Sequence, residues 1–338
     1  MRNEFKKVKL NLRHFDGNLN VQTTTTSGGF TGNSLTTEMK TFYDKNLIRM
    51  AKPNLVHDQF AQTRNIPKNG GKMIEFRKFY SLSKALNPLT EGVTPDGNKL
   101  NVTAITSEIH QYGDYITLSD LLELSAIDPV QTEAQELLAE QAGRTLDSIT
   151  RDVITAGTNV QYVGGASSRV NLAAASSNYK LTVEEVQKAI RTLKAQNAKP
   201  AKDGYFVAII HPDVSYDLTR DPEWVEASKY AGSEQLFSGE IGKIRGCRFV
   251  ETTEAKIVKE TGKSVYCTMV IGANAYGTTK IEGGGLEYIV TQLGSGGSAD
   301  PLKQRATMGW KATKTAERLV EQYMVRIESK STFASEAN

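Results

Sequence analysis

Two glycine-rich stretches place basic side chains where a phosphate could bind. The first, "GEIGKIRGCRFVET" (residues 239–252), has three glycines within eight residues, with Lys243 and Arg245 between them. A dinucleotide-binding loop needs G-x-G-x-x-G after a strand and before a helix. Here the spacing is G-x-x-G-x-x-x-G and a strand-like run follows it. We therefore expect bends that lead into a strand, with Ile241 and Ile244 in the core and the two basic side chains toward water or a neighbouring subunit.

The second stretch, Gly262-Lys263-Ser264, looks like the end of a nucleotide-binding P-loop. That motif requires a glycine five residues before its second glycine, so that backbone N–H groups can surround the phosphate. Ile257 occupies that position, and the run that follows, "VYCTMVIG", is typical of a strand. A hairpin turn is the favoured interpretation. A nucleotide-binding enzyme remains the alternative, which ATP binding lost on Lys263→Ala would support.

The remaining residues with catalytic potential do not form a recognisable site. His211-Pro212-Asp213 resembles the J-domain signature but follows the strand-like "YFVAII", so we interpret it as a helix cap. His57 and Asp58 are adjacent, and a helix would expose them together. No serine lies in a G-x-S-x-G elbow, and metal-ligand spacing is absent among His14, His57, His110 and His211. We predict no catalytic, metal or cofactor site.

The composition limits the class of protein further. The 338 residues are 39% hydrophobic and 8% aromatic, and 41 basic against 38 acidic residues leave a net charge of +3. That charge is too small for a dedicated nucleic-acid-binding protein. Cys247 and Cys267 lie in apolar runs and are expected to be reduced core thiols, as in a protein made inside the cell. No apolar run approaches the roughly 18 residues of a membrane span.

The N-terminal region, residues 1–34, is polar and reads as an arm. Its basic residues can face a polyanion such as DNA, or the segment can be a solvated tail; they are Lys6, Lys7, Lys9 and Arg13. Residues 35–51 have helical periodicity, with the apolar positions Leu35, Met39, Phe42, Leu47 and Met50. Pro53 ends this helix, and a short helical piece is predicted to follow through Phe60.

Two strand-like segments, residues 72–83 and 102–120, flank a long polar loop at about 80–101. The loop contains a Pro-Asp-Gly-Asn turn signal and has almost nothing to bury. So long a polar excursion is uncommon in a compact monomer. We expect a hairpin arm that lies on an adjacent subunit, with exposed ionic contacts from Lys84, Glu91, Asp96 and Lys99.

The longest periodic segment, residues 128–157, predicts a helix well over twice the mean globular length. Asp128 and Pro129 suit its start and Gly157 its end. Its expected buried stripe is Val130, Ala134, Leu137, Ala142, Leu146, Ile149 and Val153. We interpret it as a structural spine, because the stripe does not keep the strict heptads of a coiled coil.

The order of elements predicts two lobes of α+β class. Residues 35–178 form the first part of one lobe and end in a Gly/Ser/Ala-rich connection, residues 158–178. Residues 179–282 alternate helix and strand patterns and predict a compact α/β lobe, opening with a capping box at Thr182 and Glu185. Residues 283–338 are strand-like and are expected to return to the first lobe.

Taken together, these stretches resemble the major capsid proteins of tailed bacteriophages with the HK97-type fold, in the branch typified by coliphage N4. The likeness covers about residues 35–330 and rests on an ordered set of stretches: "IPKNGGKMIEFRKFYSLSKALNPLTEGVTPDG", "YGDYITLSDLLELSAIDPV", "EQAGRTLDSITRDVITAGTN", "AIIHPDVSYDLTRD" and "GEIGKIRGCRFVET". The resemblance implies an N-terminal arm, an extended hairpin loop, a peripheral domain with a long spine helix, and an axial domain.

The resemblance also implies a function and partners. The protein would self-assemble as hexamers and pentamers of an icosahedral shell around double-stranded DNA, with portal and scaffolding or decoration proteins as further partners. Assembly would occur in the bacterial host cytoplasm, without a membrane, a cofactor or catalysis. The cross-linking chemistry of some members is not carried over to Lys84 or Lys99. A bacterial, encapsulin-like protein compartment of the same fold is the alternative.

Overall fold

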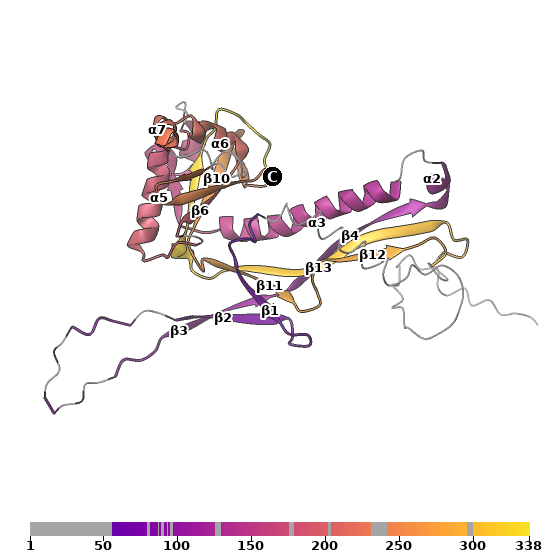
Figure 1. The fold of residues 1–338 in the computed structure, drawn as a ribbon, viewed down its shortest axis with the longest axis horizontal. Coiled ribbons are helices and arrows are strands. Elements are labelled where there is room, and N and C mark those ends of the chain that lie inside the picture. The colour runs from indigo at the N-terminus through magenta and orange to yellow at the C-terminus, as the bar shows by residue number, and fades with distance from the viewer. Residues whose placement is uncertain are drawn as a thin grey trace, which may run out of the picture.

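The chain folds into a long body with a rounded lobe at one end and a projecting hairpin (Figure 1). The computed structural model describes residues 56–338 except 80–81, 87, 89–90, 93, 95–96, 126–129, 176–178, 202–203, 231–241 and 296–299. The predicted arm, the helix at 35–51 and residues 53–55 lie outside the described part. Residues 57–60 form a turn, so the prediction of a helical piece there is wrong. None of the described helices is long and apolar enough to cross a membrane.

The long body is built on one extended strand, β13 (Arg305–Arg318). Its antiparallel neighbours are β4 (His110–Ser119), which pairs along ten residues, β12 (Glu287–Thr291) and β11 (Tyr276–Ile281). β11 also pairs in parallel with β1 (Gln62–Ile66). Alternate residues of β13 face one side of this sheet and are buried there: Ala306, Met308, Trp310 and Ala312.

Helix α3 (Val130–Thr155) lies on that buried face (Figure 1). Its 26 residues give a rod of about 39 Å at 1.5 Å per residue. The predicted spine is therefore confirmed, but its stripe is partly wrong: Leu137 is 61% exposed, whereas Leu138 is 1% exposed. Ala139 and Ala142, which lie in the same core as Leu138, are small and let the helix approach the sheet closely. At the far end of the sheet, β4 runs directly into the short α2 (Asp120–Ser125).

The rounded lobe holds a second sheet in the order β5-β14-β10-β6-β8-β7, with β9 also paired to β10. Its strands are β5 (Val160–Tyr162), β14 (Met324–Ser329), β10 (Lys263–Ile271), β6 (Phe206–Ile210), β8 (Cys247–Glu251), β7 (Gly242–Ile244) and β9 (Ile257–Glu260). Its helices are α4 (Arg169–Ala174), α5 (Val183–Ala195), α6 (Pro212–Thr219) and α7 (Pro222–Tyr230), with short 3-10 turns η2 (Val163–Gly165) and η5 (Glu321–Tyr323).

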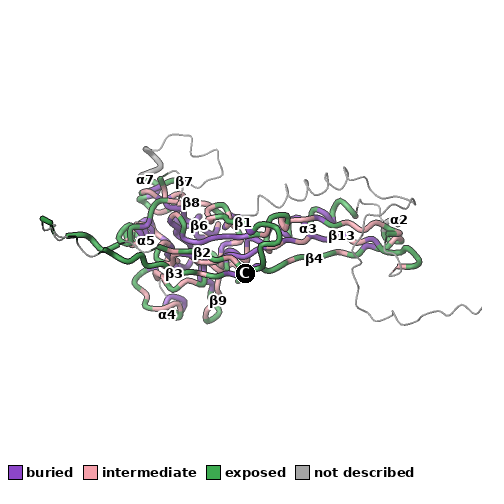
Figure 2. The backbone as a smooth tube through the Cα atoms, turned by 90° about the horizontal axis from the view of Figure 1, so that it is seen from below, coloured by how far each residue is buried: buried purple, intermediate pink, exposed green. Residues whose placement is uncertain are grey.

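The two faces of this second sheet pack against different partners. Phe206, Ala208 and Ile210 of β6 face a core shared with α5, α6 and α7. The alternate residues Val207 and Ile209 face the C-terminal end of α3 and the start of β11. The spine helix therefore contributes to both cores, and the buried residues form a continuous region from one body to the other (Figure 2).

Two segments lie in a different body from the one that the sequence patterns predict. Residues 158–178, predicted as a connection, carry β5, η2 and α4, and β5 pairs in parallel with β14. β14, expected to return to the first lobe, pairs with β10 in the second sheet. The C-terminal residues stay with this lobe, because Asp217 accepts hydrogen bonds from the Ser331 Oγ–H and from the backbone N–H of Thr332.

Local sequence signals in this lobe are confirmed. The Thr182 side chain caps α5 by accepting from the Glu185 N–H, while the Glu185 carboxylate binds Gln161 and Lys188, and Leu181 and Val186 are both buried in the same core. Cys247 and Cys267 are free, buried thiols, as predicted. Burial, the largest cause, raises the pKa of Cys247 well above its ordinary range and that of Cys267 to about 12. Both thiols are therefore poor nucleophiles.

The face of α3 that the structure assigns to the core can be checked with two neighbouring leucines. We expect Leu138→Ala to lower the free energy of unfolding by about 2–5 kcal/mol, because a fully buried side chain is removed. Leu137→Ala should cost less than about 1 kcal/mol, because its side chain lies at the surface. Urea unfolding of the unassembled chain, followed by circular dichroism, measures both. Equal losses would show that the helix is rotated from the orientation seen here.

Candidate assembly site: a projecting hairpin and a buried polar junction

The predicted hairpin is present, and the contacts of its described residues with the body lie at its base. Strands β2 (Met73–Phe79) and β3 (Val102–Glu108) pair with each other in a two-stranded sheet of their own. Phe76 is 5% exposed, and its ring lies so close to Gly277 of β11 that an added Cβ there would be 3.0 Å from it. The hydroxyls of Ser107 and Thr315 lie 2.9 Å apart. These contacts fix the direction in which the arm leaves the body.

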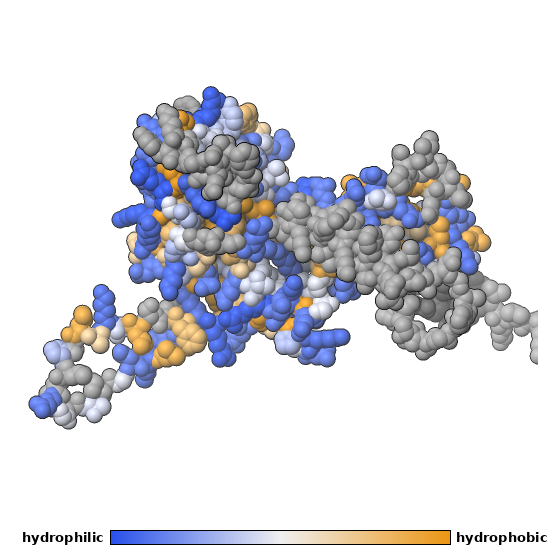
Figure 3. Space-filling model, viewed as in Figure 1, coloured by the Kyte–Doolittle hydropathy of each residue, from blue (hydrophilic) through white to orange (hydrophobic). Residues whose placement is uncertain are grey.

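Beyond its base the hairpin exposes large apolar side chains. Phe79 is 58%, Leu82 57%, Leu86 80% and Leu100 64% exposed. The arm reaches away from both bodies (Figure 1), and apolar side chains are prominent along it (Figure 3). A two-stranded ribbon is only marginally stable in water without a surface to pack on, and contiguous exposed apolar side chains mark interaction sites. The arm is therefore built to be covered by something other than this chain's own core.

The charged residues predicted for this loop are at its surface. Lys84, Glu91 and Lys99 are all exposed. Asp96 lies outside the described residues, as do the arm residues Lys6, Lys7, Lys9 and Arg13. Sequence reasoning identified the charges but missed the exposed apolar residues beside them. Leu82, Leu86 and Leu100 could have indicated this apolar surface, because they are large apolar residues in a loop that has no core of its own to bury them.

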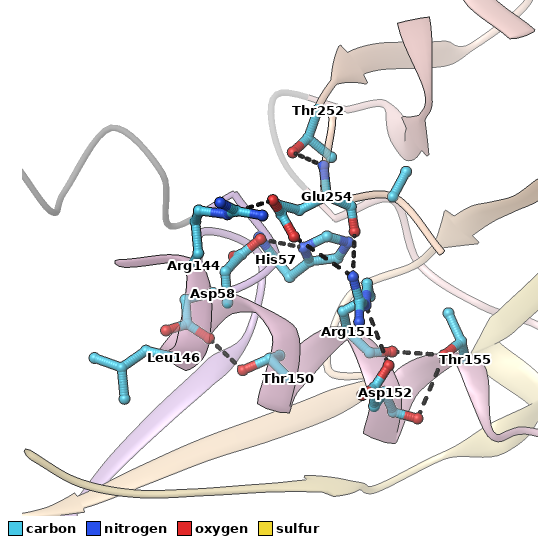
Figure 4. A network of polar contacts seen from close by, with 12 residues as sticks. His57, Asp58, Arg144, Leu146, Thr150, Arg151, Asp152, Thr155, Thr252 and Glu254 are labelled. Atoms are coloured by element: carbon cyan, nitrogen blue, oxygen red, sulfur yellow. Dashed lines mark hydrogen bonds and ion pairs between the residues drawn. The ribbon is translucent and has the colours of Figure 1, made fainter. Parts of the chain in front are cut away.

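The residues just before β1, the strand that precedes the hairpin in the chain, form a buried polar junction (Figure 4). The backbone N–H of His57 donates to Asp147 Oδ1 at 2.8 Å, and its ring Nδ1 lies 2.6 Å from Asp147 Oδ2. Both side chains are at most 1% exposed. The expectation that His57 and Asp58 are exposed together is therefore wrong: a turn, rather than a helix, directs both side chains at α3.

Asp58 joins the same helix to β13. Its Oδ1 accepts from the Thr150 hydroxyl at 2.6 Å, and its carboxylate receives the Lys314 ammonium at 2.6 Å and 2.8 Å. Lys314 is 6% exposed and donates also to the backbone carbonyl of Leu146 at 2.6 Å. Burial lowers the pKa of Lys314, and the charge of Asp58 opposes that shift. A lone buried ammonium would be costly, so these two partners make the site tenable.

A second group of ion pairs joins α3 to the rounded lobe. Glu254, in the turn after β8, receives Arg144 Nε at 2.8 Å. The Arg151 guanidinium donates to the Glu254 carbonyl at 3.1 Å and lies 3.6 Å from its carboxylate. Lys256 bridges Asp152 at 3.1 Å. Two positions about two turns apart on the helix are thus connected to one loop of the lobe (Figure 4), which fixes the angle between the bodies.

The phosphate-binding candidates are turns. Thr261 and Gly262 connect β9 to β10 with φ of 49° and 75°, and the Ser264 hydroxyl donates to the Ser335 carbonyl at 2.7 Å. Arg245 and Gly246 likewise connect β7 to β8 with positive φ. Ile244 is buried, while Lys243 and Arg245 are exposed, as predicted. Gly239 and Ile241 lie outside the described residues.

His211 is the N-cap of α6, as predicted. Its Nδ1 accepts a hydrogen bond from the Asp213 N–H at 3.1 Å, with Pro212 at the first helical position. Burial lowers the pKa of His211 below its ordinary 6.5, and the carboxylates of Asp213 and Glu251 oppose that shift. Among the described residues, no three His, Cys, Asp or Glu side chains are grouped as metal ligands would be.

Comparisons with known proteins agree with this geometry. A family model described as phage capsid protein matches residues 103–318, more than half of the chain. No curated protein matches the sequence. The likeness to a coliphage N4 branch stays a prediction.

Solved structures show the same fold at low identity. The capsid of cyanophage P-SCSP1u is 15% identical, with a TM-score of 0.60 over 81% of this chain and 87% of that one. The capsid of Ralstonia phage GP4 is 12% identical, with 0.62 over 82% and 88%. The capsid of cyanophage Pam1 is 13% identical, with 0.64 over 95% and 100%. The predicted HK97-type architecture is confirmed at the level of the fold.

The coupling between Asp58 and Lys314 can be measured in a double-mutant cycle. We expect Asp58→Ala to cost about 3–5 kcal/mol of unfolding free energy, because it leaves the Lys314 ammonium buried without its anion. The double variant Asp58→Ala/Lys314→Met should cost less than the sum of the two single changes, by about 0.5–3 kcal/mol. Urea denaturation of the unassembled chain measures all three, and Glu75→Ala, which breaks the exposed pair to Arg77, is the control. Strict additivity would mean that the pair is not a coupled unit.

The cap at His211 predicts a pH dependence of stability. The folded state holds His211 neutral more firmly than the unfolded chain does, since its folded pKa lies below 6.5. Its contribution is therefore complete above the unfolded pKa and is lost as the pH falls from 6.5 through the folded pKa. His211→Asn keeps a capping acceptor but does not titrate. Melting temperatures between about pH 7.5 and 5.5 should fall more steeply for the wild-type chain than for this variant; parallel curves would contradict the assignment.

Proposed function

Because the chain belongs to the phage capsid protein family and is a structural protein of the phage head shell, we propose that its copies assemble as hexamers and pentamers of an icosahedral shell around double-stranded DNA. The observation that carries this proposal is the projecting hairpin. Its tip exposes Leu82, Leu86 and Leu100 at 57%, 80% and 64%. Such a surface is costly in an isolated chain and becomes favourable when a repeated neighbour covers it.

The partner that fits this arm is another copy of the chain. In a closed symmetric assembly each subunit gives one arm and receives one, so a modest contact is repeated many times. The apolar side chains supply the burial. Lys84, Glu91, Asp96 and Lys99 add ion pairs at the rim, each worth only about 0.2–1 kcal/mol when exposed. These charges would determine the position at which the arm docks on the neighbouring subunit, whereas the apolar side chains would supply most of the affinity.

The two bodies support the organisation into a peripheral and an axial domain that the resemblance implies. We assign the rounded lobe to the axial domain and the long body, with α3 as its spine, to the peripheral domain. The proposed boundaries follow the predicted ones, 35–178, 179–282 and 283–338, with residues 158–178 and β14 grouped with the axial lobe because of their pairing. The ion pairs of Glu254 and Lys256 would hold the two domains at the angle that sets shell curvature.

Further partners and the absence of chemistry belong to the proposal as well. Lys6, Lys7, Lys9 and Arg13 would face packaged DNA through sequence-independent, salt-sensitive contacts. Loss of DNA per particle on removal of residues 1–33 tests that role. Portal and scaffolding or decoration proteins would bind the shell in the host cytoplasm. No catalytic step is assigned, since the described residues with catalytic potential serve as caps, turns and buried ion pairs.

Electron microscopy of the overexpressed chain tests shell formation directly. We expect shells or capsomers from the wild type. Replacing residues 82–100 by Asn-Gly should leave a folded chain with an unchanged melting temperature but without closed shells, because Leu82, Leu86 and Leu100 are lost while Phe76 and Ser107 still hold the base of the hairpin.

A matched control keeps this result interpretable. Lys263→Ala changes the other hairpin turn that sequence reasoning singled out, and we expect normal shells and no change in ATP binding from it. Normal shells from the shortened hairpin would overturn the assembly role of the arm. Particles that form in cells yet contain no nucleic acid would favour the protein-compartment alternative over a phage head.

A further inference from the structure

One face of the spine helix is unusually acidic and is exposed in the described structure. Glu133, Leu137, Glu140 and Arg144 follow one another at helical spacing along α3, on the side opposite the sheet, and all four are exposed. Glu136 stands beside Leu137 and is exposed too. Within the described part of the chain, Glu133 and Glu136 have no ion-pair partner. The result is a negative stripe with a large apolar side chain, Leu137, at its centre.

The stripe leads into a hollow at its C-terminal end. A depression of about 600 Å³ lies between α3, the turn after β8 and the C-terminal residues. Glutamates outnumber basic side chains on its walls, which include Glu140, Glu251, Glu254 and Arg144. Val56 forms another part of the wall. The first described residue of the chain therefore stands at the end of the acidic stripe.

The chain is fixed at this point. The His57 N–H is bonded to Asp147, and Asp58 is bonded to Thr150, so residues 56–58 run alongside the turns of α3 that follow Arg144. Any segment that precedes Val56 must begin beside Glu140 and Arg144. A helix over residues 35–51 would be about 26 Å long, and α3 from Val130 to Arg144 is about 23 Å long at 1.5 Å per residue. The two lengths match.

The sequence of that preceding segment is complementary to the stripe. Residues 35–52 contain four basic and two acidic residues. Lys45 and Arg49 stand at i and i+4, on one side of the predicted helix and near the apolar position Phe42, and Lys52 directly follows the last residue of that helix. Glu133, Glu136 and Glu140 recur at i, i+3 and i+7 on α3. The two sequences are therefore complementary in charge, and each also carries apolar positions.

We propose that the acidic stripe of α3, with Leu137 at its centre, is the docking surface for residues 35–52 of the same chain. The apolar positions of the segment would cover Leu137, and its three basic side chains would face the glutamates. Docking in this way adds a second layer to the spine and orients residues 1–34 from the N-terminal end of α3. This surface is separate from the hairpin arm, so it can fail without affecting the proposed assembly role.

Cysteine cross-linking in the full-length chain tests the proposal. His57 contacts the residue of α3 that stands 90 positions later, Asp147. The same offset brings residue 46 level with Glu136, next to Leu137, so the pair is Asn46→Cys with Leu137→Cys. The two native thiols are buried and do not compete. The control pair is Asn46→Cys with Val170→Cys, which places an equally accessible thiol on α4 of the other lobe, 49% exposed. With a short bismaleimide we expect an intramolecular product from the first pair, in at least about tenfold higher yield than from the control.

Charge reversal provides an independent readout. Because an exposed ion pair is worth a factor of about two to five, Glu133→Lys/Glu136→Lys/Glu140→Lys should lower the cross-linking yield by roughly tenfold. Adding Lys45→Glu/Arg49→Glu/Lys52→Glu should restore it. All three glutamates are exposed, so the melting temperature should stay unchanged. Equal yields from the two cysteine pairs would overturn the docking, and dimers in place of the intramolecular product would overturn its assignment to the same chain.

Discussion

The structure depends on how the C-terminal half of α3 is held. Asp147 of this helix accepts a hydrogen bond from the His57 N–H, and the Thr150 hydroxyl donates to Asp58. In the same turns the Leu146 carbonyl accepts from Lys314, and Arg151 binds Glu254. Ile154, one turn on, is buried against the second sheet. One helix therefore carries the contacts of both sheets and of the chain leading to the hairpin. A rigid connection of this kind is required in a shell, because a small error in the angle between domains is repeated at every subunit.

The polar character of this junction has a physical cost that its geometry offsets. Lys314, His57 and Asp147 are nearly or fully buried, and each has a partner at hydrogen-bond distance. Buried ion pairs contribute little net stability compared with apolar packing, but they are sensitive to register. A one-residue slip of β13 would move Lys314 to the other face of the sheet, away from Asp58. The junction thus specifies one alignment of helix and strand, and the alanine-rich contact beside it supplies the packing.

The hairpin follows the opposite principle. Its base is well packed, with Phe76 on Gly277, while its tip presents Leu82, Leu86 and Leu100 to solvent. A compact monomer normally removes such residues from its surface. In a subunit that assembles, exposed leucines raise the free energy of the isolated chain relative to the assembled one, because association buries them.

The amino-acid sequence by itself determined the local elements: the spine at 128–157, the caps at Thr182 and His211, the turns at Gly262 and Gly246, and the long polar loop. Each depends on contacts between residues close in the chain, which periodicity and turn chemistry encode. The family resemblance came from the order of those elements. The tertiary structure alone decided that Leu138 rather than Leu137 faces the sheet, that β14 and β5 join the sheet of the rounded lobe, and that His57, Asp58 and Lys314 meet. These depend on partners up to 256 residues apart, and no local pattern carries information about which distant surface an element will cover.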